Sequence, residues 1–265
     1  MQSLLPPQVD AHLVELVKAQ HLDPVLDDME RRADAHGFPI VGRAVGRFLE
    51  LQARMIGARR VVELGSGFGY SAYWFAGAVG AGGPDGEVVC TDTDPANAAL
   101  AEQYLRRAGR WEQVRYHVGD ALEGLAAVDG EIDVVYCDID KAGYPAAWAT
   151  AAERLRIGGL FLCDNVLWDG RVAGLTPAGP DDAARATEDP RAAQARPGME
   201  GRPGAPDRPG AQAQPGAQAQ PGAQDRRAAV TEAIVAMTRE VAQDPRYISA
   251  INPVRDGVLV ALRVA

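Results

Sequence analysis

Short apolar runs alternate with helical patterns along the middle of this chain, and that alternation restricts the fold more than any other feature. Five such runs predict buried strands, at Arg60 to Leu64, Glu87 to Asp92, Val114 to Val118, Asp133 to Cys137 and Gly159 to Cys163. Helices are expected after the first four runs, at Ser71 to Val79, Pro95 to Ala108, Ala121 to Ala127 and Tyr144 to Leu155. Strands and helices in alternation indicate an α/β fold, a mostly parallel sheet with helices on both faces.

The two ends of the chain have different patterns. Near the C-terminus, YISAINPV and GVLVALRV flank Arg255-Asp256-Gly257, in which Asp-Gly favours a tight turn. The last two strands should therefore pair antiparallel, as a C-terminal hairpin that completes a seven-stranded sheet. Residues 8–57 have helical patterns, and Gly37 is expected to end one helix after His36.

One long segment cannot contribute to a hydrophobic core. Residues 176–225 contain no Leu, Ile, Val, Phe, Tyr or Trp, and they hold nine of the 18 prolines. Pro-Gly recurs there every six residues, in units such as QPGAQA. We interpret 176–225 as a disordered low-complexity insert; a polyproline docking segment is the alternative. The remainder divides into an N-terminal helical segment, 1–57, that packs on the core, and one catalytic domain, 58–175 with 226–265.

Composition and short motifs exclude several classes of protein. The 36 acidic residues exceed the 27 basic ones, which gives a net charge of -9 and disfavours nucleic acid or an anionic membrane as a partner. Cys90, Cys137 and Cys163 form no CxxC pair, as expected in a reducing compartment. Neither a signal peptide nor a run of about 18 apolar residues occurs, so a cytoplasmic location is expected. The histidines lack HExxH or other metal-ligand spacing, which excludes the common zinc enzymes.

A glycine-rich loop follows the first predicted strand, within ELGSGFGYS at residues 63–71. Such a loop lets the backbone approach a ligand closely, and the helix that follows offers free N–H groups. Its spacing is GxGxG, and Tyr70 stands where a dinucleotide-binding loop has a third glycine. The next strand ends at Asp92, whose carboxylate could accept both hydroxyls of a ribose. Loop and acid together predict a nucleoside-bearing cofactor, although Asp94 before Pro95 could serve only as a helix N-cap.

Acidic residues also follow the two later parallel strands. Asp138, Asp140 and Lys141 follow one of them, and Asp164 and Asn165 follow the next. The carboxyl ends of parallel strands line one crevice, so these side chains should converge there with the glycine loop. Two carboxylates and an amide oxygen suit Mg²⁺. The alternative is that each acid only caps the next helix.

These blocks resemble one known family, the metal-dependent class I S-adenosylmethionine O-methyltransferases, which include catechol and caffeoyl-coenzyme A O-methyltransferases. The resemblance covers about residues 38–174 and 226–265. Its marks are VVELGSGFGYSA, the acid of CTDTD, VYCDIDKAGY, LFLCDNVLWDGRV and DPRYISAINPVRDGVLVALR. It implies a Rossmann-like class I methyltransferase fold and, as for many relatives, a homodimer.

The resemblance also implies roles for particular residues. The implied ligands of a divalent cation are Asp138, Asp164 and Asn165, with Lys141 as general base. The implied S-adenosylmethionine contacts are Glu63, Gly65, Gly67, Ser71, Asp92 and Asp120. Trp168 and Tyr144 match positions that border the acceptor, although simple packing would also explain each aromatic ring. The expanded loop after DNVLWDGRV and the segment from Phe38 to Arg43 depart from many relatives, so the acceptor's identity is not carried over.

The expected reaction is methyl transfer from S-adenosylmethionine to a hydroxyl of a small metal-chelating, catechol-like acceptor, assisted by Mg²⁺. Three alternatives remain at this point. A nicotinamide dehydrogenase would use a similar sheet, but the third glycine is absent. A transfer-RNA hydroxynucleoside O-methyltransferase would share the motifs. A non-enzymatic scaffold would act through the repeat insert.

Overall fold

The computed structural model describes residues 5–83, 85–175 and 223–265. The predicted low-complexity insert at 176–225 lies outside this part of the chain except for its last three residues. Whether it is disordered therefore stays a prediction.

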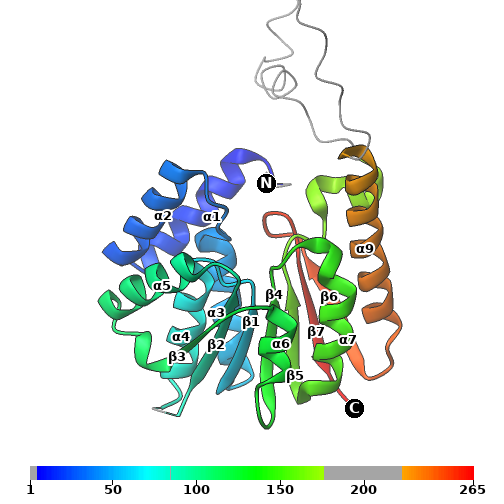
Figure 1. The fold of residues 1–265 in the computed structure, drawn as a ribbon. Coiled ribbons are helices and arrows are strands. Elements are labelled where there is room, and N and C mark those ends of the chain that lie inside the picture. The colour runs from blue at the N-terminus through cyan, green and yellow to red at the C-terminus, as the bar shows by residue number, and fades with distance from the viewer. Residues whose placement is uncertain (1–4, 84, 176–222) are drawn as a thin grey trace, which may run out of the picture.

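A single seven-stranded sheet forms the centre of the molecule (Figure 1). Its strands are β1 (Arg60–Leu64), β2 (Glu87–Asp92), β3 (Val114–Val118), β4 (Ile132–Cys137), β5 (Leu155–Cys163), β6 (Tyr247–Asn252) and β7 (Val258–Arg263). Their order is β3-β2-β1-β4-β5-β7-β6. The first five strands are parallel, and β7 runs antiparallel to both β5 and β6. The expected mixed sheet with a C-terminal antiparallel hairpin is confirmed.

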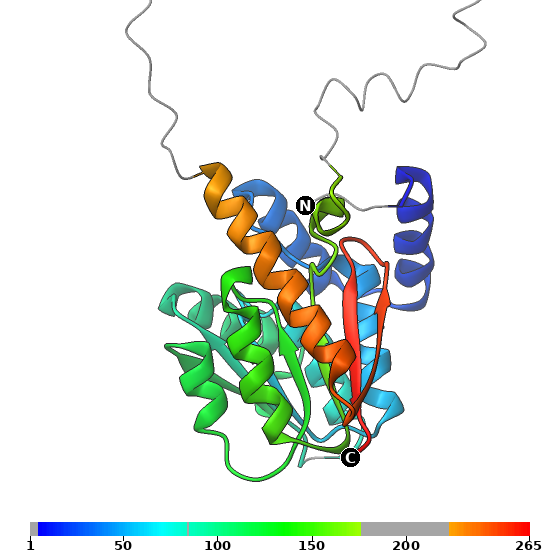
Figure 2. The same ribbon diagram turned by 90° about the vertical axis from the view of Figure 1, so that its right-hand side faces the viewer.

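Helices cover both faces of this sheet, as Figures 1 and 2 show. One layer contains α2 (Pro24–His36), α3 (Gly42–Met55), α4 (Tyr70–Gly80) and α5 (Pro95–Arg107), and α1 (Pro7–Gln20) packs on α3 outside it. The opposite layer contains α6 (Ala121–Ala126), α7 (Tyr144–Arg154) and α9 (Ala223–Gln243). Short 3₁₀ turns complete the chain at η1 (Trp111–Gln113), η2 (Lys141–Gly143) and η3 (Trp168–Ala173).

The strand sequences explain why two layers are needed. Successive strand residues point to opposite faces, so Val61 faces the α3 and α4 layer, whereas Val62 faces the α6 and α7 layer. Val134 and Val135 divide in the same way on β4. Because both faces of the central strands are apolar, each must be covered by helices.

The strand predictions agree closely with the structure, and two differences have local causes. The bounds of β1, β2 and β3 match, but β5 begins four residues early because Leu155 pairs with Ile132 ahead of a register shift. Helix α9 was not predicted, since its first three residues lie within the segment 176–225, which was interpreted as a disordered insert. Its apolar face consists of Ile234, Met237 and Val241, whose side chains are fully buried.

Helix α2 ends at Gly37, as its sequence predicts. Asp23 caps α2 by accepting a hydrogen bond from the N–H of Val25 at 2.8 Å, and Gly37 ends that helix in the left-handed conformation at φ 61°. Among the described helices, none combines the length and the apolar character needed to cross a bilayer.

Candidate functional site

A large cavity lies where the strand order reverses. The chain moves outward from β1 to β2 and β3, then returns to place β4 on the other side of β1. Ligands of open α/β sheets bind at such a reversal, beyond the carboxyl ends of the strands. The cavity there has a volume of about 570 Å³, and residues that follow β1, β2, β4 and β5 line it.

The glycine loop after β1 forms one wall of this cavity. Gly65 has φ 85°, and a Cβ atom there would lie 2.5 Å from the backbone oxygen of Asp138. Only glycine permits both this conformation and this close approach of β1 to β4. The N–H of Gly67 donates to Oδ2 of Asp92 at 3.0 Å, which holds the loop against the end of β2.

The structure separates the roles of the two candidate acids after β2. Asp94 caps α5, because its Oδ1 accepts from the N–H of Ala96 at 2.8 Å, and it does not line the cavity. Asp92 does line the cavity, together with Gly65, Gly67, Ser71 and Asp120. Asp120 is also the N-cap of α6. Five of the six predicted cofactor contacts therefore border one cavity.

Glu63, the sixth predicted contact, is fully buried behind that wall. It does not line the cavity, and Ser66 does. Its Oε1 has no hydrogen-bond partner, whereas the thiol of Cys90 approaches Oε2 at 3.6 Å. Burial raises the pKa of Glu63 to about 7, and the nearby hydroxyls of Ser71 and Ser66 only partly offset that rise.

The strand-end acids of β4 and β5 converge as predicted. Asp138, Asp164 and Asn165 line the same cavity. Burial and the neighbouring charge of Asp164 raise the pKa of Asp138 to about 8, and burial also raises the pKa of Asp164. Oδ1 of Asn165 is buried without a hydrogen-bond partner. Asn165 has φ 56°, a left-handed conformation that asparagine tolerates better than most residues.

This arrangement fits a hard divalent cation. Two carboxylates that destabilise each other's charge and an unpartnered amide oxygen are the donors that such an ion prefers. Within the described residues, no group of three or more His, Cys, Asp or Glu side chains could hold a metal ion. Any cation here would thus depend on two carboxylates, one amide and other ligands.

Lys141 lies beside Asp138 and lines two neighbouring cavities. Its Nζ is 3.7 Å from Oδ1 of Asp138, and its side chain is 15% exposed. It lines both the main cavity and a second one of about 530 Å³, which Trp168 also lines. Its Nζ lies 5.9 Å from the ring centroid of Trp168.

Tyr144 occupies a different place from the one expected of an acceptor contact. It is fully buried and lines neither of these two cavities. Its hydroxyl donates to the backbone oxygen of Asp164 at 2.9 Å. Tyr144 therefore holds the backbone just after β5 by this hydrogen bond, and its buried ring offers an acceptor no exposed surface.

The segment between α2 and α3 forms a further wall of the cavity. Its sequence predicted only that it differs from many relatives. Residues 38–41 line the cavity, and a Cβ atom on Gly67 would lie 3.0 Å from the ring of Phe38. Phe38 also stacks edge-on against Phe68, with 5.0 Å between ring centroids. This segment therefore packs directly on the glycine loop.

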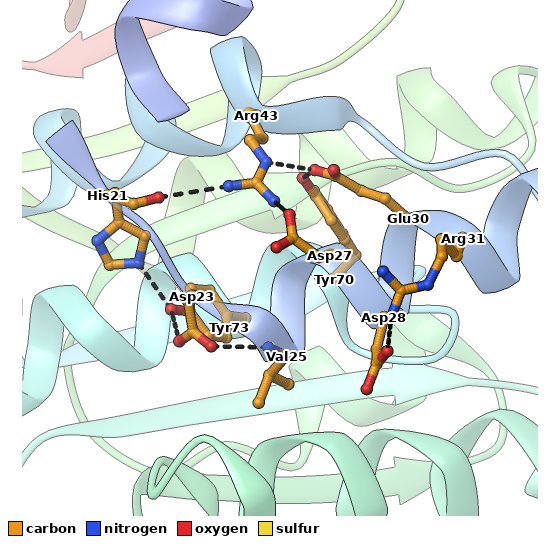
Figure 3. Close-up of polar contacts among 10 residues, drawn as sticks. All are labelled: His21, Asp23, Val25, Asp27, Asp28, Glu30, Arg31, Arg43, Tyr70 and Tyr73. Atoms are coloured by element: carbon orange, nitrogen blue, oxygen red, sulfur yellow. Dashed lines mark hydrogen bonds and ion pairs between the residues drawn. The ribbon is translucent and has the colours of Figure 1, made fainter. Parts of the chain in front are cut away.

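A buried polar cluster fixes that segment (Figure 3). The side chain of Arg43 is 1% exposed, and its guanidinium donates to Asp27, to Glu30 at 2.7 Å and to the backbone oxygen of His21. Glu30 in turn accepts from the hydroxyl of Tyr70, the first residue of α4, at 2.7 Å. The cluster thus ties α2 and α3 to the helix that follows the glycine loop.

Fold and site together define the class of protein. A sheet of this order, with a GxGxG loop at the reversal and an acid at the end of β2, has the architecture of a class I methyltransferase. A family model described as O-methyltransferase matches residues 18–189. The chain belongs to this O-methyltransferase family and is an S-adenosylmethionine-dependent O-methyltransferase.

Particular relatives agree with this assignment. The chain is 35% identical to a protein named catechol O-methyltransferase from Mycobacterium tuberculosis, over 69% of this chain and 82% of the relative. It is 31% identical to a protein of the same name from Niastella koreensis, over 65% and 78%. A methyltransferase from Podospora anserina, solved with bound SAH, shares the fold with a TM-score of 0.70 at 20% identity, over 99% of each chain.

Proposed function

We propose that this enzyme methylates a hydroxyl of a small catechol-like diol with the assistance of a divalent cation. One observation carries the proposal. Asp138, Asp164 and the unpartnered Oδ1 of Asn165 converge in the same cavity as the glycine loop, beside Lys141. The names of the two catechol O-methyltransferase relatives support the same acceptor class.

The cofactor end of the cavity would hold S-adenosylmethionine by its polar groups. Asp92 would accept the ribose hydroxyls, and Asp120 would lie beside the base. Gly65, Gly67 and Ser71 would let the methionine part approach the backbone. Glu63 would act on the cofactor without direct contact, since it is fully buried and does not line the cavity.

The opposite end would hold the acceptor and its proton. Asp138, Asp164 and Asn165 would bind the cation, which when bound lowers the pKa of a coordinated hydroxyl. Lys141 would take the proton from the acceptor hydroxyl while that oxygen bonds to the methyl carbon and the carbon–sulfur bond breaks. Trp168 would border the acceptor on the side of the second cavity.

Calorimetric titration tests this proposal directly. S-adenosylmethionine should bind with Mg²⁺ or with EDTA, whereas catechol should bind only with Mg²⁺. Replacing Asp138 with asparagine should abolish metal-dependent catechol binding and turnover. The matched control is Asp140→Asn, because Asp140 lines the same cavity but caps η2 through Ala142, a task that asparagine can also perform.

The outcomes separate the parts of the proposal. Catechol binding that persists in EDTA would refute the cation. An Asp138→Asn variant with unchanged Mg²⁺ dependence would refute the ligand set. Absence of catechol binding and turnover in the presence of Mg²⁺ would refute the acceptor class while leaving the enzyme class intact.

A further inference from the structure

Arg255, in the turn between β6 and β7, has a backbone conformation that its residue type disfavours. Its φ is 54°, in the left-handed region where glycine or asparagine is more stable. The turn is already closed by the N–H of Gly257, which donates to the backbone oxygen of Val254 at 2.9 Å. Nothing in this backbone geometry requires arginine. Strained backbone of this kind concentrates at functional sites, so the side chain is the part to explain.

The side chain of Arg255 reaches the main cavity. It lines that cavity together with Lys141, Asp164 and Asn165. Its Nη1 donates to the backbone oxygen of Ile40, in the segment that covers the glycine loop. This bond holds the guanidinium in place at the acceptor end of the cavity.

Most N–H donors of this guanidinium form no hydrogen bond with the described residues. Among the residues that the structure describes, Arg255 forms a hydrogen bond only with Ile40, and no carboxylate forms an ion pair with it. A guanidinium carries five N–H donors in a planar fork that matches a carboxylate. Arg255 lines the same cavity as Asp164 and Asn165, two of the proposed cation ligands.

We propose that Arg255 binds a carboxylate on the acceptor, so that the preferred substrates are carboxylated catechols. The inference rests on the proposed function, because it concerns the same diol. The cation ligands would orient the two hydroxyls, and Arg255 would bind the acid on the ring by charge-assisted hydrogen bonds. Asp138 and Asp164 alone would repel such an anion. With Arg255 and a divalent cation, the three positive charges at this end exceed the two negative charges of Asp138 and Asp164.

The experiment compares two diols of nearly the same shape, protocatechuic acid and its neutral carboxamide. We expect the wild-type enzyme with Mg²⁺ to have a higher kcat/KM for the acid. Replacing Arg255 with glutamine should lower the acid-to-amide ratio of kcat/KM about 10- to 100-fold, mainly through KM for the acid. Calorimetric binding of each diol in the presence of S-adenosylhomocysteine should show the same change.

Two further variants isolate the side chain. Arg255→Gly suits the left-handed backbone, so it should fold at least as stably as the wild type and still lose the acid preference. Arg255→Lys should retain part of that preference. Arg171→Gln is the matched control, because Arg171 lines only the second of the two cavities that meet at Lys141, and it should leave the acid-to-amide ratio unchanged.

A wild-type ratio near one, or a ratio that Arg255→Gln and Arg255→Gly leave unchanged, would overturn the inference. If Arg255 acts only structurally, through its bond to Ile40, its replacement would lower kcat/KM for both diols equally. The acid-to-amide ratio of kcat/KM would then stay unchanged. If both diols are methylated with Mg²⁺ in that case, the proposed function stands without this inference. If neither diol binds or reacts, the proposed function fails and this inference fails with it.

Discussion

Replacing Glu63 with glutamine tests how a buried carboxylate at the cofactor site affects stability. Glu63 is 0% exposed, and its pKa of about 7 is well above the ordinary glutamate value of about 4.5. A group whose pKa is raised by folding stabilises the native state fully below its unfolded pKa. That stabilisation is lost as the pH rises through the folded pKa.

The size of the effect follows from these two values. Between pH 4.5 and pH 7 the folded protein retains a proton that the unfolded chain releases, so stability falls with pH. One pKa unit corresponds to about 1.4 kcal/mol, and the total loss is therefore about 3 kcal/mol. Glutamine carries no charge at any pH. The stability of Glu63→Gln relative to the wild type should thus increase by about 2 to 3 kcal/mol between pH 5 and pH 8.

Urea denaturation of both proteins at pH 5 and pH 8 measures this difference. Other titrating groups, including Asp138 and Asp164, are present in both proteins and cancel to first order. A stability difference that is the same at both pH values would refute the assignment of Glu63 as a buried carboxylate with a raised pKa. If Glu63 also acts on the cofactor, calorimetry should show weaker S-adenosylmethionine binding by the more stable variant, a trade of stability for function.

Three further predictions concern the polar cluster, the cofactor end and the base. Arg43→Met should lower the free energy of unfolding by about 2 to 3 kcal/mol in urea, because it leaves Asp27 and Glu30 without their buried partner. Arg106→Met, which removes an exposed pair with Glu102, should cost less than about 1 kcal/mol, and equal losses would contradict the role of the cluster. Asp92→Asn should weaken S-adenosylmethionine binding at least about tenfold by calorimetry, since it exchanges an ionised acceptor for an amide. Asp94→Asn should change that affinity little because asparagine also caps helices. A larger loss of affinity in Asp94→Asn than in Asp92→Asn would exchange the roles of the two acids. Lys141→Met should lower kcat about 10²- to 10⁴-fold and leave cofactor affinity near the wild-type value. A variant whose kcat equals that of the wild type at every pH would exclude Lys141 as the base.

Local sequence patterns were sufficient for most of the framework. The alternation of apolar runs predicted the bounds of β1, β2 and β3, because period-two burial and turn residues act over short distances. The same patterns predicted that Asp138 and Asp164 would share one edge, since parallel strands bring their carboxyl ends together. The chain's membership of the O-methyltransferase family was also evident from its motif blocks.

Other features depended on which residues meet across long sequence separations. Asp256 was interpreted as part of an Asp-Gly turn, yet it is fully buried and its Oδ1 accepts from the N–H of Asp169 at 2.6 Å. Its burial raises its pKa to about 6. The turn thereby also holds the loop that carries Trp168, a contact that no local pattern could indicate.

Sequence alone determined the order of strands and helices, the glycine loop and the acids at the strand ends, because backbone preferences and apolar periodicity are local. Only the tertiary structure decided which of these groups face the cavity. It placed Glu63 behind Ser66 and Tyr144 beneath Asp164, and it brought Arg255 from the last hairpin to Ile40. The physical reason is that burial, pKa and hydrogen-bond partners depend on packing between distant segments, which the spacing of residues along the chain does not specify.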